Sequence, residues 1–270
     1  MQLFSRQYAL ILGDRDLSDL DLSFKVERKT RGAAGVAEIR LSNPSPETIA
    51  AASRGAQIRL SAGYPEAVPL IFSGTVRSSM TERTGPDRVL VVQGRDGAGA
   101  FAEAALLSRA YPEGTSIATV ARDAIRALGI GIGNFGDLEG AVRLRTGATT
   151  FAAGYTAHGP ATRILTDILS GAGMRWSVQH GSILVLQRGA PLSGAVEALS
   201  ADSGLLDYPT WDERRRVLTA KALIRPGLEP GRRVVIDSEA AQGGFEVRGA
   251  TWTGDTQGGD WFVSMTLRAL

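Results

Sequence analysis

Two aspartates near the C-terminus, Asp255 and Asp260, lie in the segment GDTQGGDW and could act as a catalytic pair. Two carboxylates can hydrolyse a glycosidic bond, one as acid and the other as base or nucleophile. Trp252 and Trp261 flank the segment, and indole rings beside carboxylates also suit sugar binding. The three glycines of the segment instead predict a hairpin turn between two strands. We favour the hairpin and keep a hydrolase or a carbohydrate-binding module as alternatives.

The other candidate motifs lack a part that their chemistry needs. GIGNFG at 131–136 has the spacing of a dinucleotide fingerprint, but a helix is predicted where the fingerprint needs a strand. Four aspartates between Asp14 and Asp21 lack the glycine and glutamate of a calcium loop. His158 and His180 lie in a predicted loop and turn, without an oriented partner or further metal ligands. We therefore expect no enzyme activity, no cofactor and no metal.

Composition excludes several further classes of protein. The 270 residues are enough for about two domains. The absence of cysteine excludes disulfides, thiolate metal sites and a cysteine nucleophile. No apolar run reaches the roughly 20 residues of a membrane span. The net charge of +2 is too small to indicate nucleic-acid binding by itself.

The first and last thirds of the chain are predicted to be β structure. Apolar and polar residues alternate with period two, which indicates strands with one buried face. The expected strands are 7–13, 22–28, 36–42, 57–64, 70–78 and 88–96, then 215–224, 231–238, 244–254 and 260–270. A short helix is expected within 45–55. Glycine and proline pairs between the segments predict tight turns.

The middle of the chain changes to a helical period. Helices are predicted at 98–110, at 115–129 and at 160–173, where Pro160 suits a first turn. A hairpin of 174–178 and 182–188 is expected to turn at His180-Gly181. The joint GAPLSG at 189–194 predicts a domain boundary. The fold class is therefore mainly β with an α+β insert: residues 1–98, an α+β domain at 99–190, and residues 191–270.

Two blocks of the sequence carry a family resemblance. Residues 36–76 give a strand, a turn, a short helix, a strand ending in AGY and a strand carrying FSG, and VVQGRDG follows at 91–97. Residues 222–267 contain PGLEPGRRV and the GDTQGGDW hairpin. In this order the blocks resemble the tube-like domains of phage tail hub proteins, the central baseplate proteins of contractile-tailed phages. The hub part of type VI secretion spike proteins is similar.

The resemblance implies a fold and a function. Residues 1–98 and 191–270 would each be a tube-like antiparallel β-barrel, flanking the α+β domain. Three subunits would form a pseudo-sixfold ring that adapts a sixfold tail tube to a threefold central spike. The partners would be two further copies of the chain, the tail tube or tube-initiator protein, the spike and other baseplate proteins. DNA would only pass through the lumen, and no stable membrane association is expected.

The resemblance also implies a location and a contact site. The protein would be part of the virion tail baseplate, assembled in the host cytoplasm. A basic turn follows the strand at 22–28, and in the family this turn reaches the adjacent barrel. Arg28, Lys29 and Arg31 are therefore expected to form an intersubunit contact with acidic groups. The alternative function is a tail-associated peptidoglycan hydrolase or a cell-wall-binding module.

Overall fold

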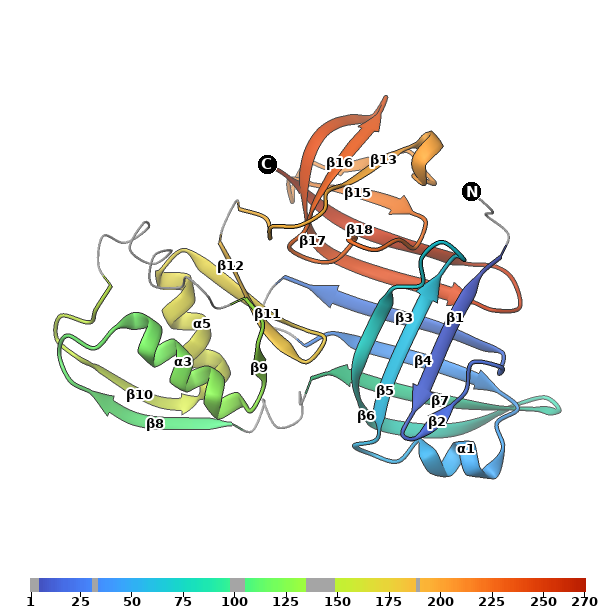
Figure 1. Ribbon diagram of the computed structural model, residues 1–270, viewed down its shortest axis with the longest axis horizontal. Coiled ribbons are helices and arrows are strands. Elements are labelled where there is room, and N and C mark those ends of the chain that lie inside the picture. The colour runs from blue at the N-terminus through green and yellow to red at the C-terminus, as the bar shows by residue number, and fades with distance from the viewer. Residues whose placement is uncertain (1–4, 31–33, 98–104, 135–148, 188–189) are drawn as a thin grey trace. The chain divides into compact units, whose positions relative to one another are not determined.

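The alternating segments of the first third form strands around one apolar core, as the sequence predicts (Figure 1). In β3, for example, Leu22, Phe24 and Val26 are buried, whereas the lysine between the last two is exposed. The computed structural model describes residues 5–30, 34–97, 105–134, 149–187 and 190–270. The elements of this region are β1 (Gln7–Leu12), β2 (Arg15–Asp16), β3 (Leu22–Lys29), β4 (Val36–Ser42), α1 (Pro46–Ala51), β5 (Gln57–Gly63), β6 (Leu70–Thr84) and β7 (Asp87–Asp96).

The last third of the chain is also built of strands. They are β13 (Glu197–Ser200), β14 (Thr210–Asp212), β15 (Val217–Ala222), β16 (Arg233–Ser238), β17 (Ala241–Asp255) and β18 (Trp261–Ala269), with a 3-10 turn at Ala201–Ser203. The four strands predicted here from the sequence are confirmed as β15 to β18. The short strands β13 and β14 were not predicted.

Both β regions belong to one sheet. The described strands follow the order β14-β15-β18-β17-β3-β4-β7-β6-β5-β1-β2, and β16 adds to β17 and pairs with β13. The link between the regions is an antiparallel pairing of β17 with β3, from Gly249 opposite Lys29 to Asp255 opposite Ser23. Among the described strands, no pairing closes either region into a barrel. The fold is mainly β, and the two-barrel arrangement stays a prediction.

Spatial contacts between residues group the chain into two compact units. Unit 1 comprises Met1–Lys29, Gly35–Asp96 and Pro191–Leu270, and unit 2 comprises Thr30–Ala34 and Gly97–Ala190. The predicted domains 1–98 and 191–270 thus contribute to the same unit. The division into three domains is not tested by this grouping and stays a prediction.

Unit 2 is an α+β structure with its own apolar core. Its elements are β8 (Leu106–Tyr111), α3 (Ile117–Leu128), β9 (Gly131–Ile132), β10 (Tyr155–Pro160), α5 (Ala161–Gly171), β11 (Met174–Gln179) and β12 (Ser182–Gln187). The side chain of Ser116 caps α3 and Gly129 ends it in the left-handed conformation. The hairpin of β11 and β12 turns at His180 and Gly181, which both have positive φ.

The helix predicted at 98–110 is wrong where the structure describes it. Residues 106–111 form β8, which pairs antiparallel with β10 from Leu106 opposite Pro160 to Tyr111 opposite Tyr155. The alanines and leucines of this segment favour a helix locally, but pairing with a distant strand overrides the local preference. Residues 98–104 lie outside the described residues.

The β17–β3 junction has a close approach that requires glycine. Gly254 lies opposite Phe24, whose ring stands edge-on to Trp261 with the ring centroids 5.4 Å apart. A Cβ at Gly254 would overlap the Phe24 ring and would lie 2.8 Å from a ring carbon of Trp261. The phenylalanine ring therefore covers the place of the missing side chain and joins the two halves of the sheet.

We predict that Gly254→Ala lowers the free energy of unfolding by about 1–3 kcal/mol, since both rings must shift to accept a methyl group. Gly249→Ala, in the same strand, is the matched control. A Cβ there would have its nearest neighbour at 3.4 Å, an ordinary contact. Urea unfolding of both variants checks this, and equal midpoints would contradict the role given to the Phe24 ring.

Candidate functional site

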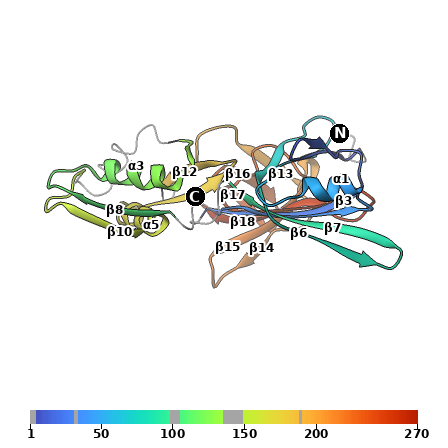
Figure 2. The ribbon, with the colours of Figure 1, turned by 90° about the horizontal axis from the view of Figure 1, so that it is seen from below.

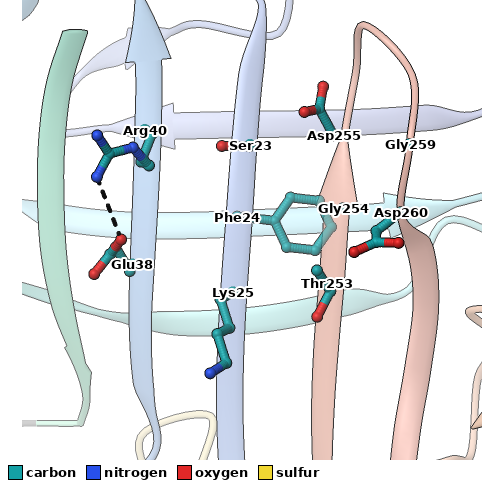
Figure 3. A pocket seen from close by; sticks show the side chains of 10 residues that line it. All are labelled: Ser23, Phe24, Lys25, Glu38, Arg40, Thr253, Gly254, Asp255, Gly259 and Asp260. Atoms are coloured by element: carbon teal, nitrogen blue, oxygen red, sulfur yellow. Dashed lines mark ion pairs between the residues drawn. The ribbon is translucent and has the colours of Figure 1, made fainter.

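The two candidate catalytic carboxylates lie in the hairpin between β17 and β18. The backbone N–H of Asp255 donates to the carbonyl of Asp260 at 2.9 Å, which closes the hairpin as predicted. A carboxylate oxygen of Asp255 accepts from the backbone N–H of Gln257 at 2.9 Å. Arg6 donates to the backbone carbonyls of Asp255 and Gly259, each at 2.8 Å. The two carboxylates point in different directions in Figure 3. The hydrogen bonds fix the loop as a turn, and the two carboxylates do not face a common site.

The tryptophans beside this hairpin are not sugar-binding platforms. Trp252 and Trp261 are only 2% and 5% exposed, respectively. The Trp261 indole N–H donates to the carbonyl of Gly63 at 3.2 Å, and the ring packs against Phe24. Stacking on a sugar needs an exposed ring face, which neither residue offers within this chain.

A shallow open groove of about 440 Å³ crosses the polar face of the sheet beside the hairpin (Figure 3). We call this side of β18, β17, β3, β4 and β7 the polar face. Its side chains alternate with the apolar residues of the core and come from every one of these strands. The groove is lined by Ser23, Phe24, Lys25, Glu38, Arg40, Thr253, Gly254, Asp255, Gly259 and Asp260.

The charges of the polar face neutralise one another. Lys25 pairs with Glu27 at 3.0 Å, and Arg40 pairs with Glu38 at 3.6 Å and with Glu82 at 2.8 Å. These side chains are largely solvated, and exposed pairs of this kind contribute only about 0–1 kcal/mol each to stability. The face is therefore polar without a strong excess of either charge, and it offers no concentrated site for an anion or a cation.

Arg28, one of the three residues expected in an intersubunit contact, is buried in unit 1. Its side chain is only 1% exposed and is held inside unit 1, with Nε 3.6 Å from Oδ2 of Asp96 and Nη1 3.5 Å from Oε1 of Glu229. Its guanidinium also lies over the ring of Trp252, 5.6 Å from the ring centroid. Burial lowers the pKa of Arg28, and the two carboxylates oppose this by raising it.

This buried cluster was not predicted as a unit from the sequence. Asp96 ends the strand predicted at 88–96 and is buried, and a buried aspartate needs a partner that a local pattern cannot identify. Glu229 comes from the segment PGLEPGRRV, more than a hundred residues away along the chain. Only the fold brings the three side chains together.

The other two residues expected in the contact are Lys29 and Arg31. Lys29 is exposed at the end of β3. Arg31 lies outside the described residues. The intersubunit contact predicted for Arg28, Lys29 and Arg31 is not tested by the structure of one chain. Arg28 itself is engaged by carboxylates of its own chain.

The other motifs have structural roles where they are described. Residues 131–134 of GIGNFG follow helix α3 and run along β12, where the Asn134 side chain bonds both backbone groups of Val185 at 2.8 Å. Residues 135 and 136 lie outside the described residues. The Asp16 carboxylate accepts hydrogen bonds from the side-chain hydroxyl and from the backbone N–H of Ser18 in a turn, and these bonds lower the pKa of Asp16. His158 is exposed on β10, 3.3 Å from the hydroxyl of Ser108.

Two kinds of feature are absent from the described residues. No group of three or more histidine and carboxylate side chains there could hold a metal ion. No helix in the same part of the chain is long and apolar enough to cross a membrane.

Comparison with known proteins identifies the fold. No family model and no curated protein sequence matches the chain. A tail protein from Neisseria meningitidis MC58 superposes with a TM-score of 0.67 at 11% identity, covering 98% of this chain and 96% of that one. The 43 kDa tail protein of prophage MuSo2 from Shewanella oneidensis gives 0.68 at 10% identity, with 98% of each chain covered.

A third similar structure comes from a secretion system. The E. coli c3393 protein, described as a type VI secretion component similar in structure to the T4 tail proteins gp27 and gp5, gives a TM-score of 0.60 at 11% identity. The match covers 93% of this chain and 73% of that one. The chain therefore has the fold of phage tail proteins and of type VI secretion proteins. The predicted resemblance is confirmed as a likeness of fold.

We predict that Arg28→Ala lowers the free energy of unfolding by about 3–5 kcal/mol, because it leaves the Asp96 carboxylate buried without its arginine partner. Lys25→Ala in the same strand removes an exposed ion pair and should cost no more than about 1 kcal/mol. Thermal and urea unfolding of both variants measure the difference. A loss for Arg28→Ala as small as that for Lys25→Ala would show that the cluster is not structural.

Proposed function

We propose that this protein is a structural hub of a phage tail baseplate. Three copies would form a pseudo-sixfold ring that adapts the sixfold tail tube to the threefold central spike. The observation that carries the proposal is the single sheet shared by the two β regions, in a fold similar to that of phage tail proteins. A sixfold tube end offers six equivalent surfaces, and three subunits match them by presenting two similar surfaces each.

The polar face supports a lumen in such a ring. It runs without interruption across the β17–β3 junction, so both regions would contribute to one continuous lining. An apolar lining would expose a large hydrophobic patch to solvent. A lining with balanced charges would let DNA pass without holding it, since tight binding to the phosphate backbone needs an excess of positive side chains.

The partners follow from this arrangement. The two open ends of the ring would contact the tail tube or tube-initiator protein on one side and the spike on the other, with further baseplate proteins around them. The protein would then be located in the virion tail, after assembly in the host cytoplasm. The proposed role needs no catalysis, cofactor or metal.

The alternative function is a peptidoglycan hydrolase or a cell-wall-binding module. Its residues would be Asp255 and Asp260 with the neighbouring tryptophans. The burial of Trp252 and Trp261 and the backbone bonds that close the hairpin favour the structural role. A lysis assay with Asp255→Ala and Asp260→Ala separates the two functions: wall lysis that either variant abolishes would favour the enzyme.

We predict that the purified protein has a mass three times the 28.5 kDa of one chain. Light scattering after size exclusion measures the mass, and negative-stain images should show rings with a central hole. A monomer at every concentration tested, or a compact particle without a hole, would contradict the hub.

We further predict that the double variant Lys29→Ser/Arg31→Ser weakens trimer formation at low salt and has a smaller effect at high salt. Pairing with acidic groups of a neighbouring subunit would be screened by added ions. The matched control Arg54→Ser/Arg163→Ser removes the same charge from exposed positions elsewhere. Equal trimer stability of both variants across the salt range would remove this turn from the interface.

A further inference from the structure

The two β regions of unit 1 repeat the same plan of six strands. In the first region the pairing order is β3-β4-β7-β6-β5-β1, and in the second it is β14-β15-β18-β17-β16-β13. In each, the strands occur along the chain in the corresponding sequence. One pair differs in direction, because β1 lies antiparallel to β5 whereas β13 lies parallel to β16. The other four pairs are antiparallel in both regions.

A detail of the longest strands fixes the equivalence residue by residue. Both β6 and β17 are 15 residues long. Each has one register shift against its hairpin partner, between Val76 and Ser78 in β6 and between Val247 and Gly249 in β17. Both shifts come at the same place in the strand, directly after its seventh residue. Gly249 therefore corresponds to Ser78, and Thr251 corresponds to Met80.

Beyond its shift, β17 pairs with β3 and so joins the two regions. The pairing places Thr251 opposite Glu27 and Trp252 opposite Val26. Trp252 and Val26 are buried on the core side, whereas Thr251 and Glu27 lie on the polar face. This junction is the connection that a ring of such units would need again between subunits.

Two strand edges are equivalent to the edges that meet at the β17–β3 junction, and in the described chain neither has a strand on its open side. The outer half of β6, from Ser78 to Thr84, pairs only with β7, and β14 pairs only with β15 (Figure 2). These edges carry exposed apolar side chains: Met80 is 58% exposed and Trp211 is 45% exposed. Leu206 and Tyr208, just before β14, are 46% and 72% exposed. Unprotected apolar edges favour pairing with another strand.

We propose that β14 of one copy pairs antiparallel with the outer half of β6 in a second copy, and so reproduces the β17–β3 junction between subunits. The strand register follows from the repeat. Starting from the equivalent residues Val247 and Val76, the pairings run through Leu267, Leu218 and Trp211 in one region and through Gly94, Ala37 and Val26 in the other. Trp211 of β14 therefore corresponds to Val26 of β3, and Asp212 corresponds to Glu27. Asp212 then lies opposite Met80 of the second copy. Trp211 lies opposite Thr81 and Thr210 opposite Glu82. This inference rests on the proposed hub and names the surfaces that join its subunits.

The register keeps the two faces of the sheet in line. Within the chain, Trp211 pairs with Leu218 and Leu218 with Leu267, which places the indole on the core side. Thr81 pairs with Leu90, which is also a core residue. Asp212 and Met80 fall on the polar face by the same pairing. A slip by one residue would turn every side chain of the added strand to the wrong face.

The two edges are different surfaces, so the contact is head-to-tail. A contact of this kind either closes into a ring or continues as a filament. The polar face would then extend from one subunit to the next. Trp211 would gain Thr81 of the second copy as its neighbour across the junction, in the place that Trp252 takes opposite Val26 within the chain.

Cysteine crosslinking tests the pairing, since the natural chain has no cysteine to interfere. The test variants of the full chain are Met80→Cys/Asp212→Cys and Thr81→Cys/Trp211→Cys. Directly opposite residues have Cβ atoms about 4.5–5.5 Å apart, near the spacing of a disulfide. Adjacent pairs alternate between the wide and narrow kinds of antiparallel pair, so one of the two variants has the favourable geometry.

The matched control is Thr81→Cys/Asp212→Cys, which uses one position from each test variant but is slipped by one residue. After oxidation, we expect at least one test variant to give covalent dimers and a closed covalent trimer on a non-reducing gel, lost on reduction. The control should give less than a tenth of that yield. Circular dichroism and light scattering confirm that each variant is folded and give its mass before oxidation.

The outcomes separate this inference from the proposed function. Trimers that do not crosslink in either test variant would overturn the β14–β6 pairing and leave the hub in place. A control that crosslinks as well as the test variants would overturn the register. A wild-type protein that stays monomeric and does not crosslink would overturn both. A covalent ladder beyond the trimer would support the pairing but contradict a closed threefold ring.

Discussion

The buried ion cluster of Arg28 is the interaction on which the arrangement of unit 1 depends. A guanidinium removed from water is costly unless carboxylates face it, and here they come from the end of β7 and from the segment before β16. The Trp252 ring covers the same group from the second β region. Because these partners belong to both regions, neither region can satisfy Arg28 alone, and the two must fold as one unit.

The shared sheet extends this local requirement into a surface that spans both β regions. Once β17 lies against β3, the polar sides of both regions form one continuous face with mutually paired charges. The apolar sides form one core. The same junction also provides a pattern that two remaining edges of the sheet can repeat with another copy. In the proposed hub, three chains that each carry this strand plan twice would match a tube end with six equivalent surfaces.

The local elements could largely be predicted because their causes are local. Alternation of apolar and polar residues predicted β3, β4 and the four strands from β15 to β18. The helical period of residues 115–129 predicted α3. The same reasoning failed for β8, where leucine and alanine favour a helix that strand pairing overrides. Strands as short as β13 and β14 are too brief to show a period.

The sequence by itself thus determined the mainly β class, the helical insert, the hairpin that contains Asp255, and a resemblance to phage tail hubs. It did not determine that Arg28 would be buried while the next residue, Lys29, is exposed. That outcome depends on Asp96 and Glu229, which are distant along the chain. Local periodicity specifies which face of a strand is buried, but only long-range pairing decides which strand lies beside it.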